Sequence, residues 1–280
     1  MRALFTNGRC CTLTLLDPCV SNRVSFSKPL EEAEIQNPKS KIQNLKQRLV
    51  EGLQVITGEG VLSGSGHLST RVPGTETFLI NPRFAGVLAG PKDICTVNLE
   101  GKRIAGKGPI PSETPIHAAV YRSRQDVGSV IHCHARYSIL VGLLDDGLIP
   151  FNREARLFAD GVPIFPESRG INSFAMAQRM VDVLGPHYAV FLRGHGIVVV
   201  GPGIEGTCIS AIQLERACQD QLLMMSIVAV KPMSDAGRGR NNARLENPYR
   251  AWPFLLYKHG VKSKAQIRAG IRALEEGEHY

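Results

Sequence analysis

Apolar residues between Ile42 and Ile56 recur every three or four positions, which places them on one face of a helix. This spacing predicts an amphipathic helix over residues 42–58. Apolar residues follow the same period in several later segments. We expect further helices at residues 115–124, 137–144, 173–184, 204–230 and 264–275.

Short segments rich in β-branched residues lie between these helices and are bounded by Gly, Pro or Asp. They predict strands at residues 67–71, 77–80, 94–98, 103–105, 127–134, 189–193 and 197–200. Several of these strands follow one another in hairpin-like runs. This order favours an α/β domain with a mostly antiparallel or mixed sheet over a doubly wound parallel sheet.

The composition is that of a soluble globular protein. Of the 280 residues, 43% are hydrophobic and 21% are charged, which is enough apolar material for a core without disulfides or structural metals. No apolar run approaches the roughly 20 residues that span a bilayer, so we expect no membrane segment. The seven cysteines are odd in number and include no CxxC pair, which indicates free thiols in a reducing, cytoplasmic compartment.

The net charge of +8 is unevenly distributed. Residues 1–50 hold eight Lys or Arg against four Asp or Glu, so half of the excess lies there. No clustered basic patch follows and only 6% of residues are aromatic, so we expect no nucleic-acid partner. We expect a poorly ordered extension at residues 1–40, the main folded domain at 41–232, and a C-terminal tail at 233–280 with a helix that packs on the core or on a neighbouring subunit.

The strand predicted over residues 127–134 ends in His132-Cys133-His134. Because side chains alternate along a strand, His132 and His134 point to one face and Cys133 to the other. Two imidazoles that converge on one point begin a transition-metal site. Alone, the pattern more often reflects two ordinary core or surface histidines.

Another histidine lies between two glycines, in Arg193-Gly194-His195-Gly196, where two predicted strands meet. Glycines let the backbone approach a site closely, although a simple hairpin with an exposed His195 is the plainer interpretation. Together with His132 and His134, it supplies a third imidazole. Three histidines leave coordination positions open, as in catalytic metal sites.

Glu113 precedes a predicted helix that Pro115 opens. A lone glutamate there most simply offsets the helix dipole. Near a cation, the same carboxylate could ligate a metal or act as a general base. His117 lies one helical turn further on, and we interpret it mainly as a core histidine or a neighbour of the site.

As a set, these motifs resemble the class II aldolase and adducin superfamily, which includes fuculose-phosphate aldolase, ribulose-phosphate 4-epimerase and related decarboxylases. The resemblance covers roughly residues 44–230 in order and spacing. It implies a three-layer α/β/α sandwich with a central, mostly antiparallel sheet. It also implies a homotetramer with active sites at subunit borders.

The resemblance further implies one divalent ion per subunit, Zn, Mn, Co or Fe, held by His132, His134 and His195. Glu113 would be an additional ligand or an acid–base group. Non-catalytic adducin-type members lose metal ligands, whereas this chain keeps all three histidines.

The chain departs from the sugar-phosphate members at three places. Gly66-His67 stands where they usually carry Gly-Asn, Asn81-Pro82-Arg83 replaces a Ser/Thr-Gly phosphate loop, and Pro111 replaces a common serine. Proline offers no N–H to a phosphate. The departures therefore favour the decarboxylase branch, which acts on hydroxylated aromatic or pyridine carboxylates.

The leading hypothesis is a metal-dependent lyase that decarboxylates a small carboxylate substrate, with Glu113 or His67 returning the proton to carbon. Arg83 or Arg71 would hold a second carboxylate. We also expect substrate contacts from Ser112 and Gly66.

Three alternatives remain open. One is an aldolase or epimerase acting on an unphosphorylated hydroxy-keto acid or sugar. Another is a non-haem iron oxygenase, which three histidines with open positions would permit. The last is a non-catalytic, adducin-like interaction protein.

Overall fold

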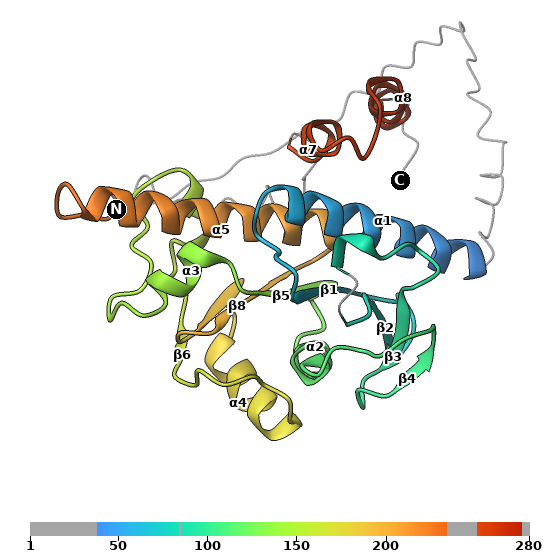
Figure 1. Cartoon of the computed structure of the whole chain (residues 1–280), viewed down its shortest axis with the longest axis horizontal. Helices are drawn as coiled ribbons and strands as arrows, with labels where there is room; N and C mark the ends of the chain where they lie inside the picture. The colour runs from blue at the N-terminus through green and yellow to red at the C-terminus, as the bar shows by residue number, and fades with distance from the viewer. Residues whose placement is uncertain (1–37, 84–85, 234–250, 276–280) are drawn as a thin grey trace, which may run out of the picture. The chain divides into compact units, whose positions relative to one another are not determined.

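The computed structural model of the chain describes residues 38–83, 86–233 and 251–275 (Figure 1). The strands are β1 (Gly66–Arg71), β2 (Thr77–Ile80), β3 (Cys95–Asn98), β4 (Arg103–Ala105), β5 (Ser129–Cys133), β6 (Ile164–Phe165), β7 (Ala189–Leu192) and β8 (Gly196–Gly201). The helices are α1 (Pro38–Gly58), α2 (Thr114–Ser123), α3 (Arg136–Val141), α4 (Phe174–Leu184), α5 (Ile204–Met225), α7 (Trp252–Lys258) and α8 (Lys264–Glu275). Two short 3-10 helices are η1 (Gly86–Leu88) and η2 (Glu154–Phe158).

All eight strands form one sheet in the order β4-β3-β2-β1-β5-β8-β7-β6. Every neighbouring pair is antiparallel except β6 and β7, which are parallel. The predicted mostly antiparallel sheet is therefore confirmed. Strands β1, β5 and β8 lie side by side in its middle, so their ends can contribute to a common site.

The strand side chains alternate between two apolar cores, one on each face of the sheet. On β5, Ile131 and Cys133 belong to the core covered by α1, α3 and α5, whereas Val130 belongs to the core covered by α2 and α4. Figure 1 shows the same layers, with α1, α3 and α5 on one side of the sheet and α2 and α4 on the other. The predicted three-layer α/β/α architecture is confirmed.

Several predicted bounds need correction. Helix α5 ends at Met225 rather than at residue 230, and the two-residue strand β6 and the helix α7 were not predicted. Helix α1 begins at Pro38, inside the expected N-terminal extension, and residues 1–37 of that extension lie outside the described residues. The described cysteines are free and buried, as expected for thiols. Among the helices described, none has the length and apolar character needed to span a bilayer.

A buried carboxylate ties α7 to the end of α1. Glu59 lies within hydrogen-bonding distance of Lys258 Nζ (2.6 Å), His259 Nε2 (2.7 Å) and Arg216 Nη2 (2.6 Å), and its side chain is only 4% exposed. Burial acts to raise the pKa of Glu59, but the donors of these three residues outweigh it and hold the pKa at about 2. The C-terminal helices are thus fixed to the main domain by charge as well as by apolar contact.

Glu59→Gln should loosen α7, because an amide accepts these three donors less strongly than a carboxylate does. We expect a loss of about 1.5–3 kcal/mol in the free energy of unfolding at pH 7, measured with urea. The folded pKa of Glu59 lies below its unfolded value of about 4.3, so the contribution is complete above that value. It is lost as the pH falls toward about 2, and the difference between wild type and variant should shrink accordingly.

Glu100→Gln is the control for this measurement. Glu100 is 61% exposed and lies 3.7 Å from Arg122, so its substitution should change the unfolding free energy by less than about 0.5 kcal/mol. Equal losses in the two variants would contradict the special role of Glu59.

Candidate metal centre

Three histidines and a glutamate meet where β5 ends. His132 is in β5, His134 follows its last residue, and His195 lies in the turn between β7 and β8. The pairing of β5 with β8 sets Cys133 opposite Ile197, which brings this turn beside the end of β5. The ligand atoms of Glu113, His132, His134 and His195 all lie within 4.8 Å of one another. The structure therefore brings together all four residues predicted to hold a metal.

Glu113 reaches this point from the N-terminus of α2. Its side chain does not cap the helix; instead, Glu113 Oε1 accepts a hydrogen bond of 2.8 Å from the N–H of Ile171. Glu113 Oε2 lies 3.1 Å from His132 Nε2, and Oε1 lies 3.8 Å from His195 Nε2. The carboxylate thus faces the histidines, and offsetting the helix dipole is not its main interaction.

Hydrogen bonds outside the cluster orient two of the imidazoles. His132 Nδ1 lies 3.0 Å from the carbonyl oxygen of Ile197, which can only accept, so Nδ1 carries the proton and Nε2 presents a lone pair. Ser65 Oγ lies 3.1 Å from His134 Nδ1 and leaves His134 Nε2 to face the cluster. Ser65 was not predicted as a site residue, although it belongs to the Gly-rich turn before β1.

Glycines make room for this convergence. A Cβ at Gly196 would lie 2.5 Å from the carbonyl oxygen of Cys133 and 3.2 Å from His134 Cδ2, so only glycine fits here without displacement. Gly194 adopts a φ of +67° in the turn that presents His195. Gly196 therefore allows a close approach to β5, whereas Gly194 allows the turn.

Burial sets the charge of the cluster. It lowers the pKa of His195 to about 4 and also lowers the pKa of His134, in both cases with a further contribution from His132. Burial raises the pKa of Glu113, but its 3.1 Å contact with His132, together with the Ile171 N–H, brings the pKa down to about 2. At neutral pH a carboxylate therefore faces the neutral imidazoles of His134 and His195.

The geometry fits a divalent cation. The distance between His134 Nε2 and His195 Nε2 is 3.1 Å, and the two distances from Glu113 are 3.1 and 3.8 Å. Four ligands at about 2.1 Å from a tetrahedral ion would be about 3.4 Å apart. His132 Nε2 is buried without a hydrogen bond and lies 3.1 Å from Glu113 Oε2. A cation bound between these two atoms would satisfy both of them.

The other predicted site residues divide into two groups. His67 is buried beside the cluster, paired with His132 across β1 and β5 and with a ring-centroid distance of 5.1 Å to it. Gly66, with a φ of +131°, lies opposite Cys133, and Ser112 is exposed next to Glu113. These three residues lie around the cluster.

The two arginines predicted as carboxylate anchors lie in different places. Arg83 is exposed and follows Asn81, whose Oδ1 accepts from the N–H of Leu68 in β1 beside His67. Arg71 lies at the other end of β1, where its guanidinium donates to the carbonyl oxygens of Tyr121, Arg124 and Val127. Arg71 thus completes the C-terminus of α2 and does not reach the cluster.

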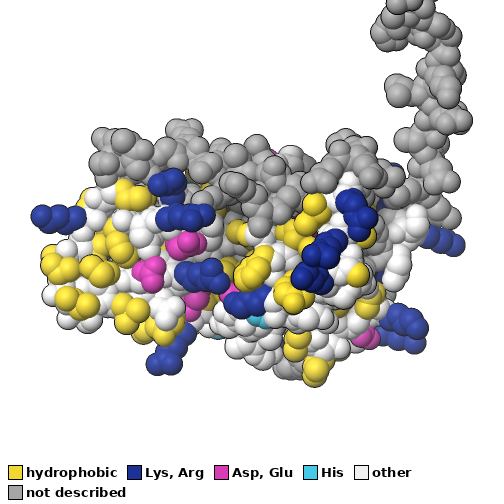
Figure 2. Space-filling model, turned by 90° about the horizontal axis from the view of Figure 1, so that it is seen from above, with side chains coloured by type: hydrophobic (Ala, Val, Ile, Leu, Met, Phe, Trp, Pro, Cys, Tyr) yellow, Lys and Arg dark blue, Asp and Glu magenta, His cyan; other side chains and the backbone are white. Residues whose placement is uncertain are grey.

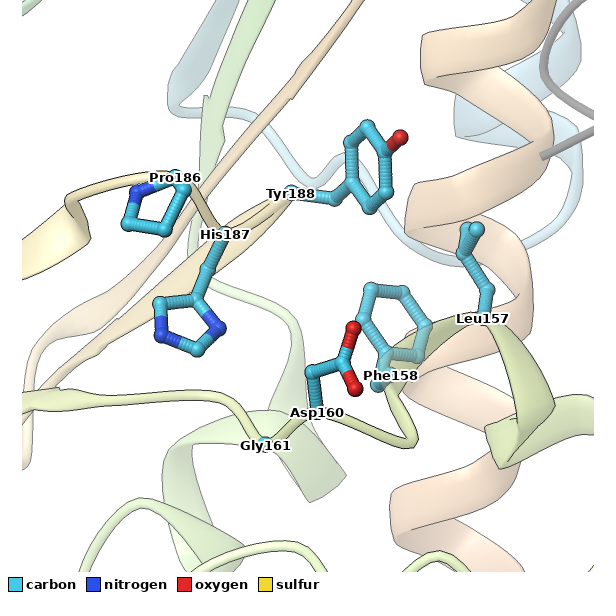
Figure 3. A pocket seen from close by; sticks show the side chains of 7 residues that line it. All are labelled: Leu157, Phe158, Asp160, Gly161, Pro186, His187 and Tyr188. Carbon is cyan, nitrogen blue, oxygen red and sulfur yellow. The ribbon is translucent and has the colours of Figure 1, made fainter. Parts of the chain in front are cut away.

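A separate cavity of about 340 Å³ lies at the opposite end of β7 from His195 (Figure 3). Its lining includes Asp160, His187 and Tyr188. Because His187 and Tyr188 precede β7 and His195 follows it, the strand separates this cavity from the cluster of Glu113 and the three histidines.

Comparison with known proteins agrees with the fold. Residues 47–222 match the family described as the Class II Aldolase and Adducin N-terminal domain. This chain belongs to that family. The match contains the whole cluster of Glu113 and the three histidines, so the family resemblance seen in the motifs is confirmed.

Proteins with different descriptions are similar to this chain. A 3,4-dihydroxyphthalate decarboxylase of Arthrobacter keyseri is 28% identical over 177 residues, which are 58% of this chain and 71% of that protein. Beta-adducin of Homo sapiens is 28% identical over 157 residues, which are 53% of this chain and 21% of adducin. The structure of L-fuculose 1-phosphate aldolase from Glaciozyma antarctica superimposes with a TM-score of 0.67 and 25% identity, over 83% of this chain and 95% of that one.

Gly196→Ala should disturb the centre of this class II aldolase fold. The added methyl group would collide with the backbone of β5 and the ring of His134, so we expect a loss of about 1–3 kcal/mol in the free energy of unfolding. Urea denaturation would measure it. Gly64→Ala is the control, because a Cβ there meets nothing within 4 Å. A Gly196→Ala protein as stable as the control would show that the close approach does not constrain the turn.

Proposed function

We propose that this chain is a divalent-metal-dependent carbon–carbon lyase that decarboxylates a hydroxylated aromatic or pyridine carboxylate. The observation that carries the proposal is the convergence of three histidines and Glu113 within 4.8 Å. Such a donor set suits Zn, Mn, Co or Fe, and three histidines leave positions open for a substrate.

A bound divalent ion would supply Lewis-acid stabilisation of the negative charge that forms when CO2 leaves. The protein would supply orientation and the proton. Glu113 is anionic at neutral pH and faces the same point as the ligands, so it can act as a further ligand or as the group that handles the proton. Arg83, exposed beyond the end of β2, is the proposed anchor for a second carboxylate.

Two features favour a carboxylate over a sugar phosphate. Asn81 uses its side chain internally, accepting from the Leu68 N–H at 2.8 Å and lying 3.3 Å from the Pro82 carbonyl, so it is not available to a phosphate. Pro82 and Pro111 offer no N–H. The similarity to a 3,4-dihydroxyphthalate decarboxylase also supports this choice.

Two enzymatic alternatives use the same centre. An aldolase acting on an unphosphorylated hydroxy-keto acid or sugar is supported by the similarity to L-fuculose 1-phosphate aldolase. An iron-dependent oxygenase would need Fe(II) as the native ion. Following CO2, aldehyde and oxygen together separates these reactions. A non-catalytic, adducin-like role would require no ion at all.

A homotetramer is part of the proposal. Apolar side chains are exposed where α5 ends, and apolar atoms gather over that end of the molecule in Figure 2. Leu223 is 58% exposed, Ile227 81% and Val228 53%. An exposed group of this kind is typical of a protein–protein contact. Its most economical partner is a second copy of the same chain.

Metal binding is testable without a substrate. Protein stripped with a chelator and reconstituted with Zn, Mn, Co or Fe(II) should retain one ion per chain by elemental analysis. His132→Ala and His195→Ala should lower the affinity at least tenfold, because each removes a direct ligand. His187→Ala, in the separate cavity, is the matched control and should bind as wild type. Equal metal content in all variants would rule out this centre.

The reaction is tested by supplying the metal-loaded protein with hydroxyaromatic dicarboxylates and with hydroxy-keto acids. We expect CO2 release without aldehyde and without a need for oxygen. Glu113→Gln should reduce kcat by about 10²–10⁴-fold, the range for loss of a general acid–base group. If the variant retains its ion, Glu113 acts on the proton; if the ion is lost, Glu113 is a ligand. Aldehyde without CO2 would instead identify an aldolase.

A further inference from the structure

A chain of hydrogen-bonded side chains leads from the cluster into the protein between β1 and α2. His67 Nδ1 lies 2.7 Å from His117 Nε2, and His117 Nδ1 lies 2.6 Å from Ser69 Oγ. Ser69 Oγ lies 2.7 Å from the hydroxyl of Tyr121. His117, Ser69 and Tyr121 have no exposed surface, and His67 is 5% exposed. Four buried polar side chains thus form one linear network.

The secondary structure explains this alignment. His67 and Ser69 are two residues apart on β1 and share a face. His117 and Tyr121 are four residues apart on α2 and also share a face. Because α2 packs on that side of the sheet, the strand and the helix contribute alternate members of the network.

The network ends beside the cluster of Glu113 and the three histidines, and His67 does not belong to that cluster. His67 pairs directly with His132 across β1 and β5, yet it is not among the four residues whose ligand atoms converge. Since His117 occupies His67 Nδ1, Nε2 is the nitrogen that can meet a substrate.

The buried end determines the direction of the hydrogen bonds. Ser69 Oγ is the hydrogen-bond partner of the Tyr121 hydroxyl among the described side chains. If Ser69 donated to Tyr121, the phenolic O–H would lack an acceptor in a dry environment, at a cost of about 1–3 kcal/mol. Tyr121 therefore donates to Ser69, Ser69 to His117 Nδ1, and His117 Nε2–H to His67 Nδ1.

The surroundings of the phenol agree with this direction. Burial is the largest cause acting on Tyr121 and raises the pKa of its phenol. The phenol therefore keeps its proton at neutral pH and can donate it to Ser69. With Nδ1 of His67 accepting, its single proton is on Nε2.

We propose that Tyr121, Ser69 and His117 are positioning residues that fix His67 as the Nε2–H tautomer. In this tautomer the neutral imidazole of His67 offers an N–H donor to a substrate oxygen beside the cluster of Glu113 and the three histidines. A neutral imidazole is a weak acid, so this N–H stabilises developing negative charge by hydrogen bonding and leaves proton transfer to Glu113. The role of this N–H in turnover rests on the proposed function, whereas the assignment of the His67 tautomer does not.

The tautomer can be read by NMR on full-length protein labelled with ¹⁵N-histidine and loaded with zinc. Long-range correlations from ring carbons distinguish a protonated nitrogen from one that carries a lone pair, and His67→Asn assigns the signal. We expect His67 to have protonated Nε2 and unprotonated Nδ1. A wild-type His67 protonated on Nδ1 would overturn the proposal, whether or not any substrate has been found.

Ser69→Ala tests the positioning role, because it removes the donor to His117. We expect a mixture of tautomers at His67 and at least a tenfold lower kcat, with KM and zinc content nearly unchanged; losing a preorganised donor outright costs about 10²–10³-fold. Ser129→Ala is the matched control, since this buried hydroxyl on the neighbouring strand donates to the Ser69 carbonyl outside the network.

Tyr121→Phe provides a second test that keeps the ring and removes only the phenolic donor. It should shift the His67 signals in the same direction as Ser69→Ala. If both variants keep the wild-type tautomer, the network does not set it and the proposal is wrong. If the tautomer changes while kcat does not, the donor role in turnover is wrong and the metal-dependent lyase still stands.

Discussion

The candidate centre depends on the register in which β5 pairs with its two neighbours. Pairing with β8 sets Cys133 opposite Ile197, so the turn that carries His195 lies beside His134, and the Ile197 carbonyl accepts from His132. Pairing with β1 sets His67 opposite His132. A slip of one residue on β5 would turn its histidines to the opposite face, against the α1 and α5 core. The apolar residues that alternate with them oppose such a slip, because they would then lose their own core.

Burial gives the centre its chemistry. The same apolar layers that hold the sheet deny solvent to the imidazoles, which lowers the pKa values of His134 and His195 and keeps their lone pairs available. Glu113 keeps its charge in the same environment because it accepts from the Ile171 N–H and contacts His132. The burial that packs the fold therefore also sets the charges of the centre, because a group that is not solvated must be either neutral or paired with a partner.

Much of this could be predicted from the sequence, because it follows from local periodicity. The alternation in His132-Cys133-His134 and the glycines around His195 were enough to predict three of the four converging residues. Segments rich in β-branched residues predicted the strands in both halves of the sheet. The network of His67, His117, Ser69 and Tyr121 could not be predicted, because it joins a strand to a helix that packs on it. For the same reason, nothing local indicated that Arg71 turns toward α2, or that β6, with two residues, joins the sheet in parallel.

The alternation along β5 also decides what the centre does not contain. Cys133 lies in sequence between two of the converging histidines, yet its side chain is in the opposite core, and burial raises the pKa of its thiol to about 12. A protonated thiol is a poor nucleophile and a poor ligand. The donor set is therefore nitrogen and oxygen alone, which suits borderline and harder cations better than copper(I) or cadmium. Oxidants that attack thiolates would find nothing to modify at this centre.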